Sequence, residues 1–210
     1  MAAAAIYPQG ANFAGAAIGA STLSADGRSI LDAAGAAVSL YKPENGFTLL
    51  LFGGRHLNDF FSFQASYGWN RNDLTLTSVQ VMTGVERSYE QSYAAGHHTV
   101  AGELMLYFRP RSSLFRPYLS AGPGLAYLSS EEGRTRFTRG SPVLPARRFS
   151  STDLCFRVAV GIDIRLRGSG SFRYSFAETI QSNPIAAQLF PPGKRNLANF
   201  QNLFGLAWRF

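Results

Sequence analysis

Large hydrophobic side chains recur at every second position in several separate segments of this chain. In residues 61–70, Phe, Ala, Tyr and Trp alternate with Ser, Gln, Gly and Asn, and residues 152–166 alternate as strictly. Successive side chains of a β-strand point to opposite faces of its sheet, so a period of two predicts strands with one apolar face. No segment shows a helical period above background. The predicted strands are residues 47–57, 60–70, 99–109, 117–129, 152–166, 172–180 and 201–210.

The second face of these strands indicates what surrounds them. In a soluble barrel it would meet water and carry Lys, Glu, Asp and Thr. Here it carries mainly Gly, Ala and Ser, with an occasional Arg, Glu or Asp. Small residues suit a cramped barrel interior, and so broad an apolar exterior must then face lipid. The sequence therefore predicts an all-β fold, a closed antiparallel transmembrane β-barrel that satisfies its backbone within lipid.

The connections between the predicted strands alternate in length. Residues 57–59, 110–116 and 167–171 are short, whereas residues 71–98, 130–150 and 181–200 are long and polar. This alternation is typical of short periplasmic turns and long extracellular loops. Pro43 followed by Asn45-Gly46 predicts a hairpin turn before residue 47, and Pro123 predicts a bulge in its strand.

The barrel needs one more strand, because seven are predicted and an even number is expected. Residues 12–21 and 33–41 both qualify, and the turn chemistry after residue 41 favours the second. We therefore expect residues 1–32 to be an Ala/Gly-rich periplasmic or partly disordered segment, and residues 33–210 to be an eight-stranded barrel domain. Residues 1–23 lack the basic start of a secretory signal, so a signal would have been removed or would lie upstream.

Composition narrows the class of protein further. Charged residues make up 16% of the chain and hydrophobic residues 46%, yet no apolar run approaches the ~20 residues of a membrane helix. The single cysteine, Cys155, excludes an internal disulfide and a thiolate metal cluster. The net charge of +7 comes from arginines scattered over strands and loops, which does not favour nucleic-acid binding.

Several short motifs resemble a known family. Residues 116–127 (RPYLSAGPGLAY) are similar to a Pro-Tyr-x-x-x-Gly-x-Gly strand, and residues 158–163 (VAVGID), residues 172–175 (FRYS) and the terminal Phe210 also match. The chain from about residue 33 to 210 resembles the small eight-stranded outer-membrane barrels, the OmpA-like or outer membrane protein β-barrel domain family. The resemblance implies an up-and-down barrel in the Gram-negative outer membrane, with Phe210 as the signal to the barrel-assembly machinery.

The charged residues predicted inside the barrel are expected to pair. An eight-stranded barrel is just wide enough for side chains to fill it, which favours a packed salt-bridge network over an ion pore. The residues of this network are Glu103, Arg157, Asp163, Arg165 and Arg173. A second group, on a long loop, could bind lipopolysaccharide phosphates or another acidic surface. It consists of Arg134, Arg136, Arg139, Arg147 and Arg148.

The histidines do not form a recognisable catalytic or metal site. His97 and His98 are adjacent, so on a strand they point to opposite faces and make poor joint ligands. We expect them at a loop end on the barrel rim, and His56 at the membrane interface. No Ser/His/Asp arrangement, phosphate loop or metal motif is present, so no catalytic, cofactor or metal residues are predicted.

The sequence thus predicts a non-enzymatic, monomeric outer-membrane barrel with a role in envelope integrity or in surface interaction through its loops. A narrow porin-like channel and a rim-active enzyme are the alternatives. The expected partners are outer-membrane lipid, lipopolysaccharide and the barrel-assembly machinery, and no nucleic acid.

Overall fold

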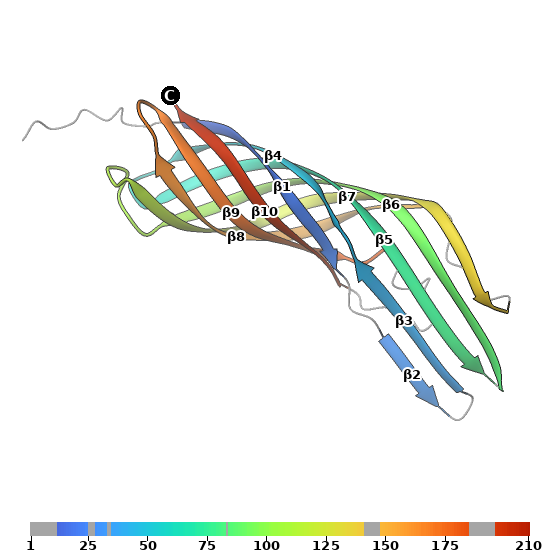
Figure 1. Cartoon of the computed structure of the whole chain (residues 1–210). Helices are drawn as coiled ribbons and strands as arrows, with labels where there is room; N and C mark the ends of the chain where they lie inside the picture. Colours follow the sequence, from blue (N-terminus) through green and yellow to red (C-terminus); the bar gives the residue numbers. More distant parts are fainter. Residues whose placement is uncertain (1–11, 25–27, 33–34, 83, 141–147, 185–195) are drawn as a thin grey trace, which may run out of the picture.

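The strands of the computed structural model form a single antiparallel sheet that closes on itself (Figure 1). The structure describes residues 12–24, 28–32, 35–82, 84–140, 148–184 and 196–210. The strands are β1 (Asn12–Ser24), β2 (Arg28–Asp32), β3 (Gly35–Pro43), β4 (Asn45–His56), β5 (Phe61–Met82), β6 (Val85–Tyr107), β7 (Phe115–Arg139), β8 (Arg148–Arg165), β9 (Gly170–Ser182) and β10 (Asn196–Arg209). In this part of the chain no helix is long and apolar enough to span a membrane.

Eight of these strands make a closed ring. β1 pairs with β10 on one side and with β4 on the other, and β4 to β9 each pair with the next strand in the sequence. Each pair is antiparallel, so the ring is an up-and-down barrel and its strands have no free edge within it. This confirms the predicted all-β fold and its eight-stranded barrel.

The two faces of the ring differ as the alternation predicted. Large side chains such as Phe63, Leu104 and Phe204 are exposed on the outer face, whereas the inner face buries most of the polar and charged side chains together with small residues and clusters of large apolar ones. A barrel surface of this kind suits contact with lipid. The short connections between strands lie at one end of the barrel together with the C-terminus, as Figure 1 shows.

The first barrel strand differs from the prediction. It is β1, with Ile18 opposite both Phe204 of β10 and Leu49 of β4, so the interpretation of residues 12–24 as part of a periplasmic tail is wrong. Residues 1–11 and 25–27 of that predicted tail lie outside the described residues. Residues 12–21 were one of the two candidates, but the turn chemistry after residue 41 favoured the other, and the exposed alanines of β1 gave only a weak hydrophobic signal. On the opposite face of β1, Gly15 leaves no room for a larger residue, since a Cβ there would lie 2.3 Å from the carbonyl oxygen of Leu206.

The predicted hairpin turn at residues 43–46 is also wrong. β3 and β4 both pair with β5, through Pro43↔Leu74 and Phe47↔Arg71, so the chain continues in one direction past Asn45-Gly46. Residues 33–41 therefore do not form the first strand of the ring, and β3 extends β4 outward instead. Gly46 allows a close approach rather than a turn, because a Cβ there would lie 1.9 Å from the carbonyl oxygen of Arg71.

Two of the three long connections are largely strands. β5 and β6 remain paired from Phe61↔Leu106 out to Met82↔Val85, and β7 continues to Arg139, so residues 71–98 and much of residues 130–150 are not loops. Parts of residues 130–150 and 181–200 lie outside the described residues. Beyond the ring these strands and the β2–β3 hairpin project as one extension, which Figure 1 shows at the end opposite the C-terminus. In these segments polar and apolar residues are mixed on both faces, which conceals strand structure in the sequence.

The predicted bulge at Pro123 does not form. Pro123 stays in register with Phe156 of β8, and the register shifts between β6 and β7 fall at Ser88/Tyr89 and Gln91/Tyr93 instead. Pairing with β6 is interrupted between Ala101↔Gly124 and Leu104↔Ala121, without an inserted residue. A proline lacks the N–H donor of a ladder bond, and here the strand tolerates that loss by leaving a gap.

Candidate functional site

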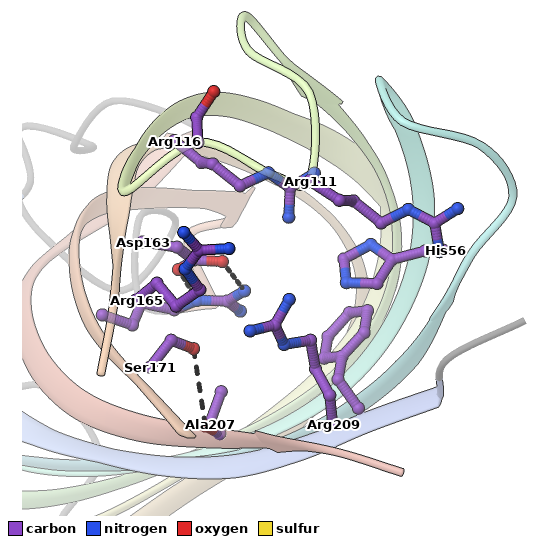
Figure 2. Close-up of a pocket in the computed structure, with 11 residues that line it drawn as sticks. His56, Arg111, Arg116, Asp163, Arg165, Ser171, Ala207 and Arg209 are labelled. Carbon is purple, nitrogen blue, oxygen red and sulfur yellow. Dashed lines mark hydrogen bonds and ion pairs between the residues drawn. The ribbon is translucent and has the colours of Figure 1, made fainter. Parts of the chain in front are cut away.

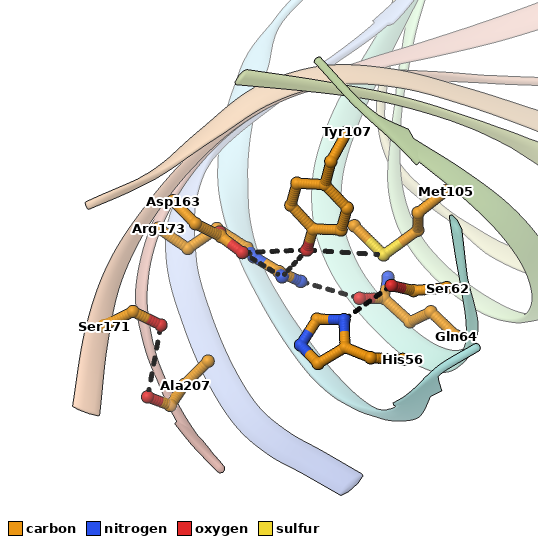
Figure 3. A network of polar contacts seen from close by, with 9 residues as sticks. All are labelled: His56, Ser62, Gln64, Met105, Tyr107, Asp163, Ser171, Arg173 and Ala207. Carbon is orange, nitrogen blue, oxygen red and sulfur yellow. Dashed lines mark hydrogen bonds and ion pairs between the residues drawn. The ribbon is translucent and has the colours of Figure 1, made fainter. Parts of the chain in front are cut away.

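The inner face near the short-turn end contains a buried ion pair with several hydrogen-bond partners (Figure 3). Arg173 of β9 donates from Nε to Asp163 Oδ1 at 2.6 Å and from Nη2 to Asp163 Oδ2 at 2.8 Å. Its Nη1 donates to Gln64 Oε1 at 2.6 Å, and the Tyr107 hydroxyl donates to Asp163 Oδ2 at 2.9 Å. The guanidinium also lies 4.5 Å from the ring centroid of Phe52. Such a bidentate, fully hydrogen-bonded pair fixes four strands to one another.

A second ion pair lies deeper in the barrel. Arg157 Nε of β8 lies 3.3 Å from Glu103 Oε1 of β6, at a geometry that is an ion pair and not a hydrogen bond. Glu103 also accepts hydrogen bonds from the hydroxyls of Ser66 at 2.9 Å and Ser120 at 2.7 Å. Arg157 donates from Nη1 to Gln201 Oε1. Both charged side chains are buried, so each depends on these partners to offset its lost hydration.

The five charges predicted as one interior network thus occupy different positions. The structure brings Arg173 together with Asp163 and Arg157 together with Glu103. Arg165, at the end of β8, lies instead at the mouth of the barrel, where it lines a cavity with Asp163 and Arg173.

His97 organises a polar layer in the outer half of the barrel, which the sequence did not predict. Its Nδ1 accepts from the side-chain amides of Asn70 at 3.1 Å and Asn199 at 3.0 Å, and its Nε2 lies 2.6 Å from Gln181 Oε1. These partners place the proton on Nε2. Because β6 extends past the ring, His97 is a buried mid-strand residue rather than a loop end. The alternation Leu197, Asn199, Gln201, Leu203 was the available signal, since it places both amides inside.

An apolar cluster lies inside the barrel at the base of the extension. Its members come from β1, β5, β6, β7 and β10, and all are buried. They are Leu23, Leu74, Leu76, Tyr93, Ala95, Leu128 and Leu197. Three kinds of packing therefore follow one another along the inside of the barrel, from the short-turn end outward. They are the ion pairs, the His97 amide layer and this apolar cluster.

The other histidines have structural contacts. His98 points to the outer face, where its Nδ1 lies 2.8 Å from the Tyr67 hydroxyl and its ring lies beside Tyr127. His97 and His98 thus point to opposite faces. His56, which we expected at the membrane interface, is buried at the short-turn end with its Nδ1 2.6 Å from Ser62 Oγ. Among the residues that the structure describes, no group of three or more His, Cys, Asp or Glu side chains is arranged to hold a metal ion.

In the part of the chain that the structure describes, the outer part of β7 is an edge of the extension. β8 pairs with β7 only as far as Glu131↔Arg148, whereas β7 continues to pair with β6 out to Arg139↔Ser88. Within the described residues, the outer part of β7 therefore has one strand neighbour, β6. An edge of this kind offers unpaired backbone groups to another molecule.

This edge carries most of the predicted basic patch. Arg134, Arg136 and Arg139 are exposed on it, and Arg148 lies at its base. Arg139 pairs with Glu86 at 2.6 Å and Arg148 with Glu131 at 3.4 Å. Exposed pairs such as these are weak, so they leave the edge available to a stronger anionic ligand. Arg147, the remaining member of the predicted patch, lies outside the described residues.

Comparison with known proteins gives the family and the fold. The outer membrane protein beta-barrel domain family matches residues 1–210. Among curated proteins, none matches the chain.

Three solved structures illustrate the likeness. Neisserial surface protein A (NspA) is 14% identical with a TM-score of 0.60, and the alignment covers 95% of this chain and 97% of that one. OprG from Pseudomonas aeruginosa is 13% identical with a TM-score of 0.54, and the alignment covers 95% of this chain and 96% of that one. Ail of Yersinia pestis is 11% identical with a TM-score of 0.53, and the alignment covers 96% of this chain and 99% of that one. At these identities the likeness establishes the fold alone.

Proposed function

The chain belongs to the outer membrane protein beta-barrel domain family, and from that premise we propose that it is a non-catalytic surface-recognition protein. The barrel anchors it in the outer membrane, and the extension beyond the ring binds acidic molecules at the cell surface. The observation that carries the proposal is the outer part of β7, which among the described residues pairs with β6 alone and carries three exposed arginines, Arg134, Arg136 and Arg139.

The ligand class follows from the chemistry of this edge. Guanidinium groups present planar donor pairs that match phosphate, sulfate and carboxylate oxygens. Arginines repeated along one extended strand suit a polymer or a lipid that repeats its charges, since each contact is individually weak and several must add. A sulfated or phosphorylated polyanion is therefore the ligand that fits, and lipopolysaccharide phosphates are one source of such groups.

One structural neighbour supplies a probe. Ail of Yersinia pestis has been crystallised with the heparin analogue sucrose octasulfate, and that chain is 11% identical to this one. The ligand belongs to Ail, and here it only suggests a soluble, densely charged molecule with which to begin.

Binding to intact cells tests the proposal. Cells that display the full chain should retain fluorescent heparin, and the triple variant Arg134→Gln, Arg136→Gln, Arg139→Gln should lose at least about tenfold in affinity, with each charged contact contributing ~1 kcal/mol. Competition by purified lipopolysaccharide separates a phosphorylated lipid ligand from a sulfated one.

The matched control removes three exposed arginines at the opposite end, Arg55→Gln, Arg109→Gln and Arg167→Gln. These face the periplasm if the short turns do, so cell-surface binding should be unchanged. Equal loss in the two triple variants, or no loss in the first, would refute a role for the β7 edge.

A further inference from the structure

A second cluster of arginines surrounds the mouth of the barrel at the short-turn end (Figure 2). Here the side chains enclose a cavity of about 20 Å³ that opens outward. Five arginines, from β7, β8, β9, β10 and the turn before β7, line it. They are Arg111, Arg116, Arg165, Arg173 and Arg209. The lining contains a single carboxylate, that of Asp163.

The carboxylate is already engaged. Both oxygens of Asp163 accept hydrogen bonds from Arg173, and one also accepts from the Tyr107 hydroxyl. Arg111 pairs at the rim with Asp59, at 3.0 Å. Asp163 and Asp59 are therefore each engaged by an arginine other than Arg116.

Arg116 is the member of this cluster that most strongly indicates an anionic ligand. It is 5% exposed, yet among the described residues no carboxylate lies within ion-pair distance of it. Its Nη2 donates to the backbone oxygen of Asp59 at 3.0 Å and its Nε to that of Arg109 at 3.4 Å. Its guanidinium carbon lies 3.8 Å from the ring centroid of Tyr107. These contacts are neutral and use two of its three nitrogens, so the buried charge lacks an anionic partner of its own.

We propose that this mouth, formed by Arg116 with Arg111, Arg165 and Arg209, is a binding site for a phosphate group presented from the periplasmic side. A cavity of about 20 Å³ admits roughly one oxygen-sized group, because a water needs ~10–15 Å³. One phosphate oxygen enters beside Arg116, and the others remain in the opening. Guanidinium groups that converge from different strands match the spread of oxygens on a tetrahedral anion.

The position of the mouth leaves two sources for this group. Trp208, Phe210 and Phe108 are exposed around the same end of the barrel, as aromatic residues are at a membrane interface. The mouth therefore lies at the depth of the inner-leaflet headgroups, and the phosphate belongs either to a phospholipid headgroup or to a soluble molecule. This site is separate from the proposed function, which concerns the opposite end of the chain.

Calorimetry on the refolded full chain tests the site. The detergent must have neither a zwitterionic nor a phosphate headgroup. Inorganic phosphate should bind saturably, with a dissociation constant of ~1 mM or lower. Arg209→Gln and Arg116→Gln should each weaken it at least tenfold. Arg167→Gln, an exposed residue of the β8–β9 turn that does not line the cavity, is the matched control and should bind as the unchanged chain does.

The headgroup source is tested by competition with a short-chain phosphatidic acid below its micellar concentration. If phosphatidic acid displaces phosphate at a concentration tenfold lower than inorganic phosphate itself requires, the site is assigned to a lipid. If the two are equally potent, the site is assigned to soluble phosphate. Heat-modifiable gel mobility confirms that each variant is folded, and Arg209→Gln carries the test if Arg116→Gln does not fold. No saturable phosphate binding, or equal binding by Arg209→Gln and the control, would overturn the proposal.

Discussion

The backbone N–H of Phe210 donates to the carbonyl oxygen of Asn12 at 2.9 Å, so the last residue of the chain is bonded to the first residue of β1. The two strands that this bond joins stay paired along their length, up to Ser24↔Ala198. Ring closure therefore depends on the pairing of β1 with β10, the first and the last strand of the ring. The Phe210 side chain itself is 70% exposed and points away from the interior.

The first prediction separates assembly from stability at Phe210. Phe210→Ala should lower the amount of folded protein in the outer membrane several-fold, if this side chain is the signal that the family resemblance implies. The unfolding free energy of the purified, refolded barrel should change by less than ~1 kcal/mol, because the phenyl side chain of Phe210 packs on no interior group. Phe108→Ala, another exposed aromatic at the same end, is the control and should reach the membrane normally.

A second prediction concerns the buried pair of Arg173 and Asp163. Arg173→Leu should cost about 3–5 kcal/mol, because it leaves a buried carboxylate without its cation. Urea unfolding in lipid vesicles measures the loss. The double variant with Asp163→Asn should recover much of it, since no uncompensated charge remains. A single variant that loses less than ~1 kcal/mol would show that water reaches Asp163.

The ring could be predicted because lipid imposes the alternation. Where both inside and outside are constrained, as at Phe61–Trp69 or Leu154–Leu166, the period of two is unambiguous. The same reasoning left β1 as one of two candidates, because alanines face outward there. It failed in the extension, where water surrounds the strands and no apolar face is required. The prediction of a hairpin turn at Asn45-Gly46 was also wrong. The glycine there allows a close approach to the backbone of Arg71 and does not form a turn.

The interior residues were predictable as a set but not as pairs. Parity along each strand placed Glu103, Arg157, Asp163 and Arg173 inside. Asp163 and Arg173 are direct cross-strand partners, a register set by the short β8–β9 turn. Glu103 and Arg157 instead meet across β7, and this depends on the registers of β6, β7 and β8 together. The arginine-lined mouth was not predictable, because it unites residues from five separate segments.

A third prediction concerns a carboxylate on the lipid-facing surface. Glu178 of β9 points outward between Phe176 and Ile180, opposite Val158 and Phe200, and borders an apolar groove of about 480 Å³. A carboxylate costs free energy at this depth, so Glu178→Leu should stabilise the barrel by ~1 kcal/mol in vesicles. Asp73→Leu, at an exposed position on the outer part of β5, is the control and should have little effect. Destabilisation by Glu178→Leu would indicate a specific polar partner for this side chain.

The fourth prediction is that the barrel does not conduct ions. The ion pairs of Arg157 and Arg173, the His97 amide layer and the cluster around Leu128 and Leu197 follow one another inside it, and each draws side chains from several strands. Planar bilayers containing the purified protein should therefore show no steady current. Leu128→Ser with Leu197→Ser should not create one, because the His97 layer lies beneath the apolar cluster and stays packed. Wild-type current that disappears in Arg157→Gln would instead identify a continuous pore past that arginine, and the porin-like alternative would then replace the anchor in our proposal.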